Sequence, residues 1–162
     1  MIREWEIIKG TKMERFSSVE DILDFAIARE LESNDFYMKL AERMDNPAMR
    51  KVFEDFAKEE LGHKAKLEAI KQTGSAIQPE SVTSLGIADY VVDVAPKPDM
   101  SYADALTLAM KKEKAAYRLY LDLAMAAEDE ELTDTFLSLA QEEAKHKLRF
   151  EIEYDDVVLK ET

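Results

Sequence analysis

Apolar residues recur at alternating steps of three and four along four long stretches of the chain, which is the period of amphipathic α-helices. The predicted helices span about residues 18–45, 47–73, 101–127 and 130–157. Capping signals support these starts, since Ser17 precedes Glu20 in a capping box, Asn46 precedes a first-turn proline, and Ser101 precedes Asp104. Acidic residues between 127 and 131 suit the N-terminus of the fourth helix.

Two segments lack this helical period. Residues 1–16 are mixed and predict no element. Residues 74–100 contain three prolines and Gly86, together with an apolar run at 87–94, and predict a long connection with one short helix.

The second half of the chain repeats the first at an offset of 83 residues. Matching pairs include Leu23–Leu106, Ala26–Ala109, Glu30–Glu113, Tyr37–Tyr120, Phe53–Phe136, Ala57–Ala140, Glu60–Glu143 and His63–His146. Two similar helical hairpins joined by a long crossover predict an all-α, antiparallel four-helix bundle that forms one domain over residues 1–162.

Composition and charge narrow the functions open to such a bundle. Gly and Pro number only four each, as is typical of long helices, and the formal net charge of −13 disfavours nucleic acid and anionic membranes as partners. The absence of cysteine excludes disulfides, thiolate catalysis and Cys-bound iron within the chain. With no apolar segment typical of a leader or a membrane span, a soluble cytoplasmic protein is expected.

Each predicted helix has an apolar seam, the row of apolar residues three and four apart that faces the core, and ionisable side chains interrupt this seam. Apart from Glu153 late in the fourth helix, the acids and imidazoles on the seams are Glu30, Glu60, His63, Glu113, Glu143 and His146. Glu30 and Glu60 lie equally far from the turn between their helices, about 22 Å at ~1.5 Å per residue, and the second hairpin has the same spacing. These six side chains are therefore expected at one height in the core.

Four carboxylates and two imidazoles in one apolar layer require positive charge, because buried and unpaired carboxylates would each cost several kcal/mol and repel one another. Two divalent ions supply it. Each Glu-x-x-His pair can direct one oxygen and one nitrogen at the same ion, and Glu30 and Glu113 then complete or bridge the two positions. This ligand set matches that of di-iron and di-manganese carboxylate bundles. Oxygen-rich ligands with one imidazole per ion suit iron or manganese, so two iron ions are predicted, with manganese or a mixed pair as alternatives.

Other interpretations apply to single residues. One Glu-x-x-His on a helix is usually a solvent-facing pair, and the duplication on two seams is what favours metal binding here. Glu59 and Glu142 lie ~100° around the helix from the predicted ligands and are expected to be surface residues or partners between helices rather than ligands. Tyr37 and Tyr120, two turns from Glu30 and Glu113, either donate a hydrogen bond to a site carboxylate or simply pack in the core.

The chain resembles the rubrerythrin branch of the ferritin-like superfamily over about residues 18–155. The motifs that carry the resemblance are Glu30 with Phe36-Tyr37, Phe56-Ala57-x-Glu59-Glu60-x-x-His63, Glu113 with Tyr120, and Leu139-Ala140-x-Glu142-Glu143-x-x-His146. The resemblance implies a ferritin-like bundle whose non-haem di-iron centre reacts with hydrogen peroxide or dioxygen, in a homodimer that protects cells from oxidative stress.

Two departures separate this chain from rubrerythrins proper. Their C-terminal rubredoxin-like domain with four cysteines is missing, so the resemblance implies an external electron-donor protein such as a rubredoxin. They also carry a further Glu three residues after the ligand on the third helix, where this chain has Ala116. That Glu is associated with metal movement during peroxide reduction. Ser33 and Ala116, both small and one turn beyond Glu30 and Glu113, are expected to leave space for an oxygen ligand.

Three classes of function remain open from the sequence. The first is a redox enzyme that oxidises a diferrous centre with peroxide or dioxygen. The second is a ferroxidase, or an iron-binding or iron-storage protein. The third is a metal-binding or structural bundle without catalysis.

Overall fold

The computed structural model describes residues 14–73, 76–92, 97 and 99–159. The other residues lie outside this description, including most of the predicted N-terminal segment and parts of the predicted crossover. The chain divides into two compact units, residues 20–75 and residues 1–19 with 76–162, which are described separately below.

The first unit is a hairpin of α2 (Val19–Glu42) and α3 (Pro47–Gln72). Its helices run antiparallel, since Lys71 Nζ lies 2.6 Å from Asp24 Oδ1 near one end and the Tyr37 and Phe56 rings pack edge to face nearer the other. The turn follows the predicted cap, because Asn46 Oδ1 accepts hydrogen bonds from the Ala48 and Met49 amides.

Helix α2 ends at Glu42, earlier than the predicted end near residue 45. The backbone amides of Arg43 and Met44 donate hydrogen bonds to the carbonyls of Leu40 and Ala41, each three residues earlier in the chain. This tighter turn satisfies the last carbonyls of the helix and turns the chain toward Asn46.

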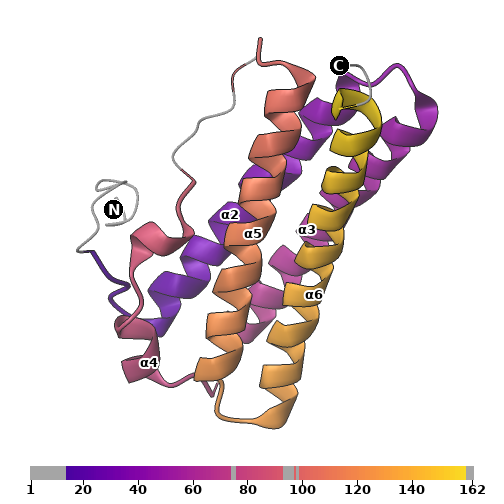
Figure 1. Ribbon diagram of the computed structural model, residues 1–162. Coiled ribbons are helices and arrows are strands. Elements are labelled where there is room, and N and C mark those ends of the chain that lie inside the picture. The colour runs from indigo at the N-terminus through magenta and orange to yellow at the C-terminus, as the bar shows by residue number, and fades with distance from the viewer. Residues whose placement is uncertain (1–13, 74–75, 93–96, 98, 160–162) are drawn as a thin grey trace. The chain divides into compact units, whose positions relative to one another are not determined.

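The second unit contains α5 (Tyr102–Ala126) and α6 (Glu130–Glu153), which lie side by side (Figure 1). Both helices start within a residue of their predicted positions. Ser101 Oγ accepts from the Asp104 amide, as its predicted cap requires, and Asp129 Oδ1 accepts from the Leu132 amide. Past Glu153 the fourth helix continues as a π-helical segment, Tyr154–Val158, and thus reaches its predicted end with a wider turn.

The connection before α5 contains α4 (Pro79–Thr83) and a 3₁₀ helix, η1 (Ile87–Tyr90), where one short helix was predicted. Tyr90 anchors η1, since its ring packs 6.0 Å from that of Phe16 and its hydroxyl donates to Asp122 on α5. Burial and this hydrogen bond raise the pKa of Tyr90 above its ordinary value, so the phenol stays protonated as a donor.

The core of both units consists of aliphatic and aromatic side chains on the buried faces of the helices. Fully buried examples are Leu23, Phe53 and Leu67 in the first unit and Leu106, Leu123 and Phe136 in the second. No described helix combines the length and apolarity needed to span a membrane. Each unit therefore has an apolar interior in which a few charged side chains are also buried.

Candidate metal centre

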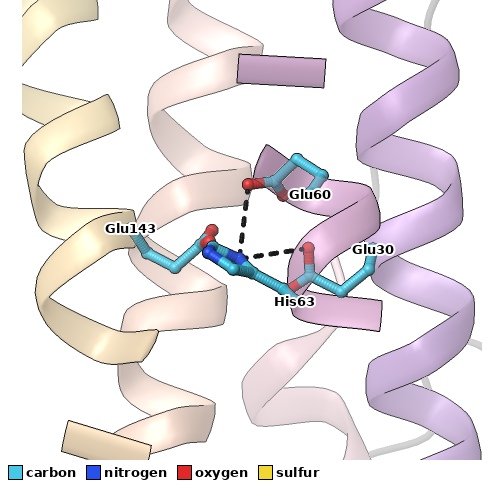
Figure 2. Close-up of side chains that lie close together, drawn as sticks. All are labelled: Glu30, Glu60, His63 and Glu143. Carbon is cyan, nitrogen blue, oxygen red and sulfur yellow. Dashed lines mark ion pairs between the residues drawn. The ribbon is translucent and has the colours of Figure 1, made fainter. Parts of the chain in front are cut away.

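Three predicted ligands meet within the α2–α3 hairpin. Glu30 projects from α2, and Glu60 and His63 project from successive turns of α3 (Figure 2). His63 Nδ1 lies 3.6 Å from Glu30 Oε2 and 3.6 Å from Glu60 Oε1. All three residues are only 1–2% exposed, and each offers a ligand atom within 4.8 Å of the others.

The α5–α6 hairpin gathers the equivalent three residues. Glu113 projects from α5, and Glu143 and His146 project from α6. His146 Nδ1 lies 3.6 Å from Glu113 Oε1, and the three ligand atoms again fall within 4.8 Å of one another. These residues are also 1–2% exposed, so each hairpin carries a buried Glu–Glu–His group of the same composition.

Helical spacing explains why these groups form. Residues three apart lie on one face of an α-helix, so Glu60 and His63 point the same way, as do Glu143 and His146. The apolar seam turns that face inward, and the antiparallel partner brings the remaining carboxylate to the same height. The sequence pattern therefore determines both the direction and the height of the three predicted ligands in each hairpin.

The chemistry of this donor set fits a divalent transition-metal ion. Nitrogen and oxygen ligands bind such ions at about 2.0–2.2 Å, so two ligand atoms on one ion are about 3–4 Å apart. The 3.6 Å separations in the two hairpins fall in that range and are longer than an ordinary hydrogen bond. Two carboxylates and one imidazole per hairpin balance the charge of one such ion and suit iron or manganese.

Tyr37 and Tyr120 are buried as predicted, at 0% and 1% exposure. The Tyr37 ring contacts Phe36 at 5.5 Å and Phe56 at 6.4 Å between centroids, as expected of a core aromatic residue. Their hydrogen bonding to a site carboxylate stays a prediction. Glu59 is exposed and Glu142 is half-buried, and neither belongs to the three-residue groups described above.

Sequence reasoning missed two polar contacts that brace these hairpins. Asn34 Nδ2 donates to the Ala57 carbonyl across the α2–α3 pair, at 2.8 Å. Tyr102 Oη donates to Glu153 Oε2 across the α5–α6 pair, at 2.5 Å. For the contact between Tyr102 and Glu153, the one indication in the sequence was that Glu153 lies at an otherwise apolar position of its helix. The four-residue step from Glu30 to Asn34 could have signalled the first.

The sequence profile of the family described as rubrerythrin matches residues 21–154. The chain belongs to the rubrerythrin family. The predicted family is therefore confirmed, and the match spans both hairpins and all six predicted ligands. No curated protein matches the chain.

Solved structures agree on the fold of this rubrerythrin-family chain. A proposed ferritin-like diiron-carboxylate protein from Thermotoga maritima is similar with a TM-score of 0.70 and 22% identity, over 89% of this chain and 98% of its own. A hypothetical protein from Pyrococcus furiosus is similar with a TM-score of 0.69 and 26% identity, over 86% of this chain and 89% of its own. These similarities confirm the predicted all-α, ferritin-like fold class.

Proposed function

We propose that this chain is a non-haem di-iron oxidoreductase that reacts with hydrogen peroxide or dioxygen. The observation that carries the proposal is the buried Glu–Glu–His group found in both hairpins. Membership of the rubrerythrin family supports it, as does the likeness of the fold to a proposed diiron-carboxylate protein. In this proposal each of the two groups would hold one of two iron ions.

Each residue of the centre has a defined task. Glu30, Glu60 and His63 would hold one ion, and the equivalent three residues of α5 and α6 would hold the other. Once bound, two ferrous ions would supply the two electrons that, with two protons, reduce hydrogen peroxide to water or dioxygen to hydrogen peroxide.

The protein contributes charge and exclusion of water. Four carboxylates offset the charge of two divalent ions, and their flexible side chains can adjust as that charge rises. Because all six ligands are 1–2% exposed, the surrounding side chains keep bulk water away from them. A dry site strengthens the electrostatic interactions that hold the ions.

Electrons for a further turnover come, in this proposal, from a donor protein of the rubredoxin type, because the rubrerythrin region of residues 21–154 contains no cysteine to hold a rubredoxin-like iron. We also propose a homodimer acting in the cytoplasm against oxidative stress. Sizing of the purified protein tests the homodimer.

Anaerobic reconstitution with Fe²⁺ tests the proposed function directly. Two irons per chain are expected, followed by near-ultraviolet absorption of ferric iron when peroxide or dioxygen is added. Adding the two oxidants in separate experiments identifies the faster one. Continued loss of peroxide with an added electron donor indicates an enzyme, whereas many irons retained per chain indicate storage. Failure to bind iron would leave a structural bundle.

Oxidation should slow in the Ala116→Leu variant while both irons remain bound. Ala116 is half-buried one turn beyond Glu113, and a larger side chain there would occupy the space expected to admit the oxidant. A slowing of about tenfold or more is expected, because small displacements at a reacting centre have large effects on rate.

Stopped-flow absorption measures the rate of this oxidation. Ala115→Leu makes the same change at the neighbouring half-buried position and is the matched control. Equal rates in both variants would contradict the prediction.

A further inference from the structure

Asn34 connects the two ligand-bearing segments of the α2–α3 hairpin. Its side-chain amide donates to the Ala57 carbonyl at 2.8 Å. Asn34 lies one turn after Glu30 on α2, and Ala57 lies one turn before Glu60 on α3. The hydrogen bond therefore joins the helices within one turn of the ligands on both sides.

This contact fixes the height of one helix against the other. Packing of apolar side chains resists separation of two helices more strongly than a small slide along their axes, whereas a hydrogen bond has a narrow range of length and angle. A carbonyl has two lone pairs, so Ala57 can accept from Asn34 and keep its bond within α3. The half-buried position of Asn34 limits competition from water.

The sequence repeat supplies an internal comparison. The positions equivalent to Asn34 and Ala57 are Tyr117 and Ala140. The side chain of Tyr117 has no amide group, and the residue is 37% exposed, so the second hairpin does not reproduce the contact between Asn34 and Ala57. In the second hairpin the side-chain hydrogen bond between the two helices is the one from Tyr102 to Glu153.

The second brace lies farther from the ligands. Tyr102 precedes Glu113 by three turns, and Glu153 follows His146 by two turns. At the corresponding positions of the first hairpin the repeat has Val19 and Ile70, which form no such polar pair. The two hairpins thus present the same ligands at the same 3.6 Å separation but hold them by different contacts.

We infer that Asn34 is a positioning residue that holds Glu30 level with Glu60 and His63, and that it makes the α2–α3 group the tighter of two unequal metal positions. The inference rests on the proposed function, since it concerns the same six ligands. Its physical basis is preorganisation, because groups that support metal ligands typically change affinity by about 10–100-fold.

Titration of the complete protein with Co²⁺ tests the inference. Visible d–d absorption reports the geometry around each ion, and calorimetry reports affinity. Two binding steps are expected, the tighter of which disappears in His63→Ala and remains in His146→Ala. In Asn34→Leu, which keeps a similar volume and removes the amide, the tighter step should weaken about tenfold while the weaker step changes less than about twofold. The absorption of the first-bound Co²⁺ should shift as well.

Matched variants separate positioning from general stability. Tyr117→Leu alters the repeat-equivalent position, and Tyr102→Phe removes the distant brace. Both should leave the tighter step unchanged. Asn34→Gln retains an amide donor and should recover part of the lost affinity, and Asn34→Ala provides a second variant should the leucine disturb folding.

Three results would overturn the inference: two equal steps in the unmodified protein, an unchanged tighter step in Asn34→Leu, or equal weakening of both steps. Failure of the unmodified protein to bind two Co²⁺ ions would instead overturn the proposed function, so the two failures are distinguishable.

Discussion

Replacing both His63 and His146 with alanine is expected to abolish loading of the protein with iron. These are the chain's two histidines, so the double variant contains no imidazole at all. Each hairpin would keep two buried carboxylates but lose its nitrogen ligand, which should weaken binding by more than about a hundredfold, beyond the effect of changing a supporting group. Iron analysis after anaerobic reconstitution and gel filtration measures the loss.

Thermal unfolding without metal is the control for this double variant. Loss of two buried side chains lowers stability to some extent, so iron binding is compared well below the unfolding temperature. Each single variant should retain about one iron per chain if each histidine serves its own ion. Two tightly bound irons in the double variant would contradict the proposed ligand set.

Replacing Glu113 with glutamine is expected to shift stability in opposite directions with and without metal. Glu113 and Glu143 are both 1% exposed, and the single imidazole beside them, His146, can offset the charge of at most one carboxylate, so neutralising Glu113 relieves the remaining repulsion in the metal-free protein. A gain of about 1–2 kcal/mol is expected, which corresponds to a melting temperature higher by roughly 2–8 °C for a chain of this size. With iron the variant should be less stable than the unmodified protein, because an amide is a poorer ligand than a carboxylate.

Glu59→Gln is the matched control for this reversal. It removes the same charge from an exposed side chain next to a predicted ligand, and stability with or without metal should change little. Calorimetry gives the melting temperatures of both variants, each without metal and after reconstitution with iron. A lower melting temperature for metal-free Glu113→Gln would show that the Glu113 carboxylate contributes to folding rather than opposing it.

The sequence predicts the helices and the ligand faces well because both depend on a single helical period. The spacing of Glu60 and His63 determines that they share a face, and the apolar seam determines that this face turns inward. Caps such as Asn46 act within a few residues, so they also predict helix starts accurately.

Features that depend on contacts between distant segments were not predicted. The hydrogen bond from Asn34 to Ala57 requires the axial offset of two helices to within about an ångström, which a helical period does not supply. The same holds for Tyr90, whose burial depends on Phe16 and Asp122 from other parts of the chain. The early end of α2 reflects a three-residue hydrogen-bonding turn that many sequences can form.

The different hydrogen bonds in the two hairpins, from Asn34 to Ala57 and from Tyr102 to Glu153, bear on the evolution of the repeat. The predicted ligands recur at the 83-residue offset, whereas the hydrogen bonds that support them do not. Duplication of one hairpin would have begun with identical supports in both copies, so the present difference arose after the duplication. In a pair of identical subunits every substitution changes both halves at once. Two hairpins within one chain are free of that restriction, so each can have its own supporting contact beside the same set of predicted ligands.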